Sequence, residues 1–218
     1  HKDKRKRLQN DAKQIIRLMD IAIIKYGAGN VRSVVNALKR LGADPVLIDD
    51  KDTIAGADRV VFPGQGEASC AMRYLREKNL DTLIPSLRQP VLGICIGQQL
   101  MCRHSEEGET DCLGIFDVDV RRFQPLCHED KVPVMGWNEI HDTKTPLFDG
   151  LDGVGHDVYF IHSYYVPLCK ETIAVADYIH PYSAAIHKDN FFATQFHPEK
   201  SGSVGERILK NFLNISDK

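Results

Sequence analysis

One cysteine stands in a setting suited to nucleophilic chemistry. Cys95 is the centre of Gly93-Ile94-Cys95-Ile96-Gly97, a G-x-C-x-G pattern that joins an apolar run to a helix-like segment. A sharp strand-to-helix turn of this kind exposes the nucleophile, and the flanking glycines leave room for the helix to pack over the strand. The helix N-terminus behind the thiol favours a thiolate and a developing oxyanion. The pattern predicts a thiol nucleophile, against the alternative of a small buried core cysteine.

A histidine and a glutamate after a later apolar run complete the predicted chemistry. His197 lies in Gln195-Phe196-His197-Pro198-Glu199, where the proline ends a predicted strand and fixes the loop. A nearby imidazole can take the proton of a thiol and return it to a leaving group. Glu199 can orient the imidazole and stabilise its charged form. We therefore predict a Cys95–His197–Glu199 triad, and expect His162 to be structural or a wall of the site.

These residues need a sheet whose strands end close together. In the first half of the chain, predicted strands (21–25, 45–48, 59–62, 90–95) alternate with predicted helices (31–41, 67–77, 97–102), and Gly42 is expected to end the first helix. The second half is richer in strands (118–123, 132–140, 157–165, 172–179, 184–187, 191–196), with a hairpin turn at 187–190 and a last helix at 204–213. We expect an α/β fold: a mostly parallel central sheet flanked by helices, with an added antiparallel sheet.

Composition limits the classes of protein that this chain can be. Its 218 residues hold 28 Lys and Arg against 30 Asp and Glu, and 43% are hydrophobic, which is ordinary for a globular domain and excludes a fibrous protein. No apolar run approaches the roughly 18 residues of a membrane span. The small net charge gives no electrostatic reason to expect a nucleic-acid partner. Six cysteines without CxxC or zinc-like spacing predict a reduced, cytoplasmic protein with no metal.

The first 18 residues differ from the rest in charge. They hold seven Lys and Arg and two Asp, a net charge of +5, whereas the other 200 residues carry −7. Met19 directly precedes the first predicted strand, so we expect 1–18 to be an N-terminal extension or an added segment and 19–218 to be the functional domain. Apolar residues at helical spacing predict that 1–18 form a short docked helix. A basic arm for nucleic acid or membrane, or a disordered tag, are the alternatives.

The motifs resemble those of a known family. G-x-C-x-G followed by F-H-P-E is similar to the class I, or triad, glutamine amidotransferases, whose fold is flavodoxin-like. From Met19 to the C-terminus, further segments occur in the order seen in glutaminase subunits of imidazole glycerol phosphate synthase, an enzyme of histidine biosynthesis. These segments are Tyr26-Gly27-Ala28-Gly29-Asn30, Pro63-Gly64-Gln65-Gly66, 93–99, Gly136-Trp137-Asn138, His162-Ser163-Tyr164-Tyr165 and His197-Pro198-Glu199-Lys200-Ser201.

The resemblance implies a reaction and an oxyanion hole. Cys95 would attack the carboxamide of glutamine and release ammonia, and water would hydrolyse the thioester, with the other two triad residues as base and orienter. The N–H of Ile96 and the turn containing Gln65 and Gly66 would bind the oxyanion. Gln65 departs from the family, which commonly has valine there. Glycines on both sides permit a peptide flip, so we expect an inactive loop that flips when the partner is loaded.

The resemblance also implies how the amino-acid end of glutamine is held. Gln99, Glu107 and main-chain groups near Ser163 and Tyr164 match the positions that do this in the family. From the residues alone, Gln99 lies one helical turn after Cys95 on the same face, so its side chain can reach back over the site. The alternative is an exposed helix glutamine. No cofactor is implied.

A partner is implied as well: a (β/α)8-barrel cyclase subunit, forming a heterodimer through which ammonia passes. The matching interface positions are Tyr26, Asn30, Trp137, Asn138, Tyr159 and Lys200. Trp137 is the only tryptophan, which suits an exposed anchor better than a core aromatic. Three other functions stay open: another class I glutaminase subunit, such as that of pyridoxal phosphate synthesis; a stand-alone γ-glutamyl hydrolase; and a catalytically silent docking module.

Overall fold

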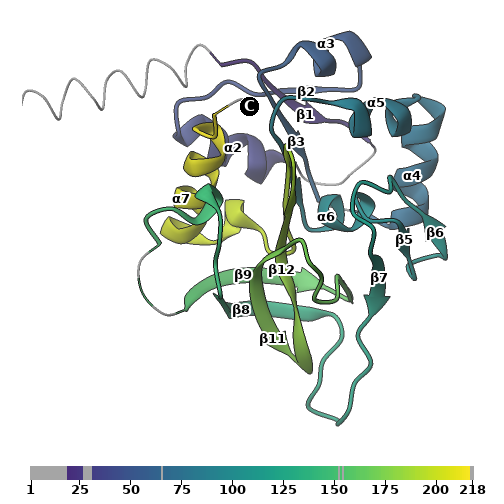
Figure 1. Cartoon of the computed structure of the whole chain (residues 1–218), viewed down its shortest axis with the longest axis vertical. Helices are drawn as coiled ribbons and strands as arrows, with labels where there is room; N and C mark the ends of the chain where they lie inside the picture. Colours follow the sequence, from purple (N-terminus) through teal and green to yellow (C-terminus); the bar gives the residue numbers. More distant parts are fainter. Residues whose placement is uncertain (1–18, 27–30, 65, 152, 154, 217–218) are drawn as a thin grey trace, which may run out of the picture.

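The structure is a computed structural model that describes residues 19–26, 31–64, 66–151, 153 and 155–216. A nine-stranded sheet runs through it in the order β2-β1-β3-β4-β13-β12-β11-β8-β9 (Figure 1). Its strands are β1 (Ile21–Ile24), β2 (Val46–Ile48), β3 (Arg59–Phe62), β4 (Val91–Ile94), β8 (Val134–His141), β9 (His156–His162), β11 (Thr172–Tyr178), β12 (His180–Lys188) and β13 (Phe191–Thr194). From β2 to β13 neighbouring strands are parallel, and from β13 to β9 they are antiparallel.

The parallel strands β1, β3, β4 and β13 are buried on both faces, which explains why they read as continuous apolar runs, whereas the edge strand β2 leaves Val46 and Leu47 exposed. In β1, Ile21 and Ile23 face one core cluster, whereas Ala22 and Ile24 face the other. Helices cover both sides, because each apolar face must be buried against another element. One cluster includes residues of α2 (Arg32–Arg40) and α7 (Gly202–Leu213). The other includes residues of α3 (Lys51–Gly56), α4 (Ala68–Glu77), α5 (Leu80–Ser86) and α6 (Ile96–Leu100) (Figure 1).

A second, smaller sheet lies beside the main one. Its order is β10-β7-β5-β6, formed by β5 (His104–Ser105), β6 (Thr110–Asp111), β7 (Asp119–Arg122) and β10 (Tyr164–Tyr165). Two short 3-10 helices, η1 (Pro146–Phe148) and η2 (Pro198–Lys200), complete the described elements. Because β10 follows β9 after one residue, this small sheet continues directly from the edge of the large one.

The predicted α/β class and the division into parallel and antiparallel halves are confirmed, with differences in detail. The antiparallel strands continue the central sheet instead of forming a separate one. The strand predicted at 157–165 is broken at Ser163 into β9 and β10. The short helices α3 and α5 were not predicted, and α5 contains Pro85. Gly42 follows α2 with φ +89°, as expected of a glycine that ends a helix.

Three further predictions concern the N-terminal segment, membrane spans and the cysteines. Residues 1–18, predicted to form an extension, lie outside the described residues. In the part of the chain that the structure describes, no helix has the length and apolarity needed to span a bilayer. All six cysteines belong to that part and are free thiols.

Candidate active site

Strand order brings the three predicted triad residues to one edge of the sheet. β13 lies parallel to β4, with Thr194 opposite Ile94. The Cys95 N–H donates to the carbonyl of Thr194 at 2.7 Å, so the chains leave both strands side by side. Parallel strands end at the same edge, which is where open α/β sheets place their ligand sites. Residues 102 positions apart in the chain (197 minus 95) thus become neighbours.

Cys95 occupies the strained turn that its sequence context predicted. Its φ of +52° and ψ of −108° lie outside the regions that residues with a side chain favour, and α6 begins at the next residue. The flanking glycines make this turn possible. A Cβ at Gly97 would lie 2.2 Å from the carbonyl oxygen of Phe62, and one at Gly93 would lie 2.9 Å from the carbonyl carbon of Gly97. Helix α6 therefore packs on the sheet at a distance that excludes any side chain there.

The imidazole and the carboxylate form a buried pair. His197 Nδ1 lies 2.8 Å from Glu199 Oε1, and each side chain is 2% exposed. Because an ionised carboxylate only accepts, Nδ1 carries the proton, and Nε2 is left to exchange a proton with a neighbour. Nε2 is buried and has no hydrogen-bond partner among the described residues. The structure thus brings His197 and Glu199 together as predicted.

Electrostatics at this pair favour the charged imidazole. Burial lowers the pKa of His197, but its interactions with the Cys95 side chain and with the Glu199 carboxylate outweigh burial and raise the pKa to about 10. A protonated imidazole beside a sulfur is the partner that a thiolate needs, and it is also a proton donor for a leaving amine. The site can therefore supply the two groups that acyl transfer requires, a thiolate to attack the acyl carbon and a protonated imidazole to protonate the leaving group.

Sequence reasoning missed a residue that contacts the predicted nucleophile, Cys95. Gln195 is fully buried, and its Nε2 lies 3.7 Å from Cys95 Sγ. Sγ also lies 3.6 Å from the carbonyl of Ile161, to which a thiol can donate. The sequence feature that could have identified Gln195 is its position, directly after the last residue of β13 and two residues before His197.

Of the predicted glutamine-binding residues, Gln99 contacts the segment of Ser163 and Tyr164. Gln99 is 4% exposed, and its Nε2 donates to the carbonyl of Tyr164 at 3.0 Å and to Gln195 Oε1 at 3.1 Å. The alternative of an exposed helix glutamine is therefore wrong. The carbonyl of Ser163 accepts from the Phe123 N–H at 3.0 Å, which ties this segment to β7.

Glu107 is engaged at a helix N-terminus. Its Oε2 accepts from the Ala68 N–H at 2.9 Å, the first residue of α4. Burial raises the pKa of Glu107, partly offset by that backbone hydrogen bond. A role for Glu107 in holding glutamine stays a prediction.

The turn predicted to supply the oxyanion hole packs directly on Cys95. A Cβ at Gly64 would lie 1.9 Å from the carbonyl oxygen of Ile94 and 2.7 Å from Cys95 Cβ. Gly66 has φ +123°, which a glycine adopts readily. Ile96 is the first residue of α6, where a backbone N–H has no intrahelical partner. Gln65 lies outside the described residues.

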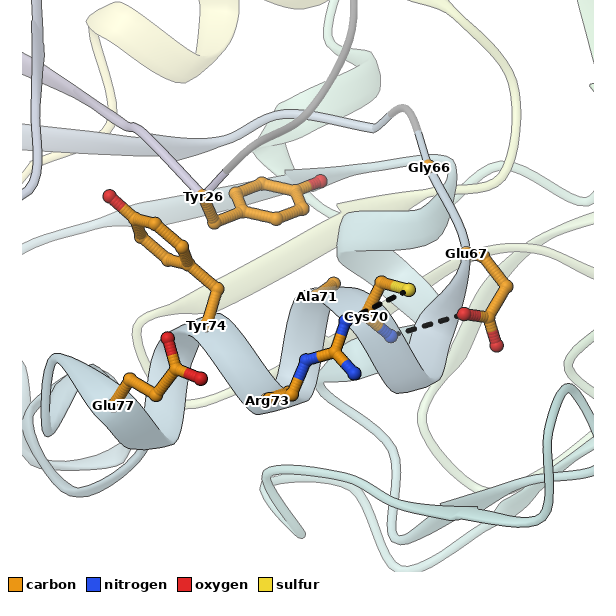
Figure 2. A pocket seen from close by; sticks show the side chains of 8 residues that line it. All are labelled: Tyr26, Gly66, Glu67, Cys70, Ala71, Arg73, Tyr74 and Glu77. Atoms are coloured by element: carbon orange, nitrogen blue, oxygen red, sulfur yellow. Dashed lines mark hydrogen bonds between the residues drawn. The ribbon is translucent and has the colours of Figure 1, made fainter.

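Figure 2 shows a pocket that Gly66, Tyr26 and residues of α4 line. Tyr26, predicted at the partner interface, is 3% exposed, and its hydroxyl donates to the carbonyl of Pro63. Its ring packs edge-on against Phe62. Tyr26 therefore supports the turn in the isolated chain, and an interface role for it stays a prediction.

Three other predicted interface residues, the exposed Trp137 and Lys200 and the half-buried Tyr159, lie together beside the predicted triad. Trp137 is 58% exposed, so the alternative of a core aromatic is wrong. It pairs across strands with Tyr159, at 6.0 Å between ring centroids, and Lys200 Nζ lies 5.9 Å from the Tyr159 ring. Asn138 donates to the carbonyl of Asp177 at 2.9 Å, and Asn30 lies outside the described residues.

His162, expected to be structural or a wall of the site, lies in the core. It is 6% exposed and packs against the rings of Phe123, Phe160 and Tyr182. Its Nδ1 donates to the carbonyl of Tyr164 at 2.7 Å. Burial lowers the pKa of His162 to about 4, an effect that the hydrogen bond to Tyr164 opposes.

This buried imidazole predicts a loss of stability in acid. Below about pH 6.5 the unfolded chain binds a proton at His162, whereas the folded chain does not until about pH 4. Acidification between these values therefore favours unfolding, by up to about 3 kcal/mol. In His162→Asn, where the side-chain amide can still donate to Tyr164, the free energy of unfolding from urea titrations should fall less between pH 7 and pH 4 than in the parent chain. Equal falls in both proteins would contradict the prediction.

Comparison with known proteins gives a consistent result. Residues 22–215 match the glutamine amidotransferase class-I family. The chain is 62% identical over 197 residues to the imidazole glycerol phosphate synthase subunit HisH of Bacteroides thetaiotaomicron, covering 90% of this chain and 100% of that protein. It is 46% identical to the subunit of the same name from Shewanella sediminis, covering 88% and 89% of the two chains. Among solved structures, PurLQS from Thermotoga maritima superimposes with a TM-score of 0.65 at 16% identity, covering 90% and 98%, which shows a shared fold.

Proposed function

The chain belongs to the class-I glutamine amidotransferase family and, within it, to the HisH subunits of imidazole glycerol phosphate synthase, and on this premise we propose how it acts. It hydrolyses glutamine to glutamate and ammonia, and delivers the ammonia for imidazole glycerol phosphate synthesis in histidine biosynthesis. The observation that carries the proposal is the placement of Cys95, on a strained turn at a helix N-terminus, beside the buried His197–Glu199 pair. The reaction takes place in the cytoplasm, where thiols stay reduced.

The first half of the reaction forms a thioester. The Cys95 sulfur attacks the carboxamide carbon of glutamine, and the carbonyl oxygen becomes an oxyanion. His197, which has taken the thiol proton, gives it to the amide nitrogen, so that the carbon–nitrogen bond breaks and ammonia leaves. In the second half His197 takes a proton from water, the hydroxide attacks the thioester carbon, and the carbon–sulfur bond breaks to give glutamate while His197 returns the proton to the Cys95 sulfur. Glu199 orients the imidazole in both halves.

We also propose that the oxyanion hole needs the partner for completion. The N–H of Ile96 supplies one donor, and the turn at Gln65 and Gly66 supplies the other. Gly64 leaves no free space between this turn and Cys95, so the turn cannot approach further and must rotate a peptide to aim an N–H at the oxyanion. The positive φ of Gly66 supports such a rotation, since glycine accepts either sign of φ at little cost.

The partner is a (β/α)8-barrel cyclase subunit, which docks on the face that carries Trp137. An exposed aromatic beside Tyr159 and Lys200 suits an interface anchor, because buried aromatic side chains dominate the energy of many interfaces. This face adjoins the triad through β9, whose Tyr159 carbonyl accepts from the His197 N–H at 2.9 Å. Ammonia released there would have a short path into the barrel.

The three rival functions are less well supported. A silent docking module has no need of a buried His197–Glu199 pair beside a strained cysteine. The names of the relatives disfavour a glutaminase subunit of pyridoxal phosphate synthesis. A stand-alone γ-glutamyl hydrolase would not require the exposed Trp137 face.

One experiment separates the proposed function from the stand-alone hydrolase. Ammonia release from glutamine is measured for the chain alone and with the cyclase subunit carrying its substrate or an analogue. We expect near-silence alone and an increase of about 10²-fold or more in the complex, the amount that a single oxyanion donor contributes. Full activity alone, unchanged by the cyclase, would leave the triad standing but would contradict both the partner and the rotating turn.

A further inference from the structure

We propose that Gln195 is a positioning residue that donates a hydrogen bond to the Cys95 sulfur. Its amide is oriented by Gln99, whose own amide is oriented by the backbone carbonyl of Tyr164. The inference rests on the proposed function, because Cys95 is the nucleophile of that reaction. It assigns to Gln195 a part in the chemistry that the triad does not include.

The orientations of the two amides follow from this backbone carbonyl. The carbonyl of Tyr164 can only accept, so the Gln99 atom 3.0 Å from it must be the amide nitrogen. The same nitrogen lies 3.1 Å from Gln195, which must therefore present its oxygen to Gln99. The nitrogen of Gln195 then remains, and it points at Cys95 Sγ, 3.7 Å away. A backbone carbonyl thus determines that a donor, and not an acceptor, faces the sulfur.

Packing keeps Gln195 from turning away. Its side chain is 0% exposed, and its backbone N–H donates to the carbonyl of Ala184 at 2.8 Å. Rotation of the amide would place its nitrogen against the Gln99 nitrogen, two donors with no acceptor between them, and would lose that buried hydrogen bond at a cost of about 1–3 kcal/mol. The neighbouring Gln98 is equally buried, yet neither polar atom of its amide has a partner among the described residues. Burial alone therefore does not explain why the Gln195 amide forms a hydrogen bond with the Cys95 sulfur.

The donor matters because it distinguishes the two states of the nucleophile. As a thiol, Cys95 can donate its proton to the carbonyl of Ile161, 3.6 Å away. As a thiolate it can only accept, and the carbonyl of Ile161 then offers nothing to it. Gln195 Nε2 offers a hydrogen bond to the charged form, which favours that form. The amide also fixes one direction of the sulfur lone pairs while His197 approaches from another.

The test measures the titration of Cys95 directly. The rate of Cys95 alkylation by iodoacetamide is followed by mass spectrometry of its peptide from pH 5 to pH 10, in the parent chain, Gln195→Met and Gln195→Glu. Methionine keeps the volume and removes the donor, so the midpoint should rise by about one pH unit. Glutamate keeps an acceptor for Gln99 and adds negative charge beside the sulfur, so its midpoint should rise further. If the buried glutamate prevents folding, Gln195→Met still decides.

Gln98→Met is the matched control, because it makes the same substitution in an equally buried glutamine that does not contact the sulfur. Its midpoint should equal that of the parent chain. Equal midpoints in Gln195→Met and the parent, or an equal shift in the control, would overturn the proposal. The proposed function is judged separately, by ammonia release from the parent chain with the cyclase, so that a failure of one does not imply a failure of the other.

Discussion

Cys95→Ala should lower ammonia release from glutamine, measured in the complex with the loaded cyclase subunit, by about 10⁴-fold or more. Removal of the sulfur leaves nothing to form the thioester, and the remaining groups can at best orient glutamine and stabilise an oxyanion formed by water. The folded chain should change little in stability, because alanine tolerates the environment of this small side chain about as well as cysteine does. Addition of ammonium salt should restore cyclase product formation, since that step bypasses glutamine.

Cys70→Ala is the control for this prediction. Cys70 lies on α4, is exposed, and lines the pocket of Figure 2, where its neighbours include Glu67 and Arg73 but no histidine. An exposed thiol without a base should have no part in the reaction, so the rate should stay within about two-fold of the parent, as for most surface substitutions. A Cys95→Ala variant that kept activity within about ten-fold of the parent would contradict the assignment of the nucleophile.

Gly64→Ala should be among the most destabilising single substitutions in the chain, at about 3 kcal/mol or more. The new Cβ would lie 1.9 Å from the carbonyl oxygen of Ile94 and 2.7 Å from Cys95 Cβ, and the first of these is backbone that cannot swing aside. Relief requires the Pro63 turn to move off the elbow, so the glutaminase activity of the residual folded fraction should fall too. Urea-induced unfolding measures the stability, and ammonia release in the complex measures the activity.

Gly56→Ala provides the comparison. Gly56 is the last residue of α3, and a Cβ there would meet nothing within 4 Å. Alanine costs less entropy than glycine in a helix, so we expect a small gain of about 0.5 kcal/mol. If Gly64→Ala were as stable as Gly56→Ala, the close packing of the turn on the nucleophile would be contradicted.

Motifs that act locally were predictable from the sequence, and contacts that depend on strand order were not. The G-x-C-x-G turn was predictable because its two glycines are what allow α6 to pack closely on the sheet, as it does in the structure. Glu199 was predictable because it lies two residues from His197. Gln195 was missed because its contact with Cys95 exists only since β13 lies next to β4, and periodicity says nothing about which strands are neighbours.

The exposure of single side chains and the presence of short helices could not be derived from the sequence pattern. Trp137 is exposed on β8, which pairs with β9 at the end of the nine-stranded sheet. Tyr26 matches an interface position by resemblance, and in the structure its hydroxyl reaches the carbonyl of Pro63 and its ring enters the core. A role at the interface stays a prediction. Helices α3 and α5 are six and seven residues long, too short for a helical period to be recognised with certainty in the sequence.

The place of β13 in the sheet has a consequence for biosynthesis on the ribosome. β13 lies between β4 and β12 although it is the last of the described strands in chain order, and His197 and Glu199 follow it closely. Proteins emerge N-terminus first, so a nascent chain exposes Cys95 well before the base that would activate it has been made. The reactive pair therefore forms only when the C-terminal strand inserts into the middle of the sheet. Until then Cys95 lacks the imidazole beside it, so the insertion of β13 into the sheet is the step that assembles the reactive pair.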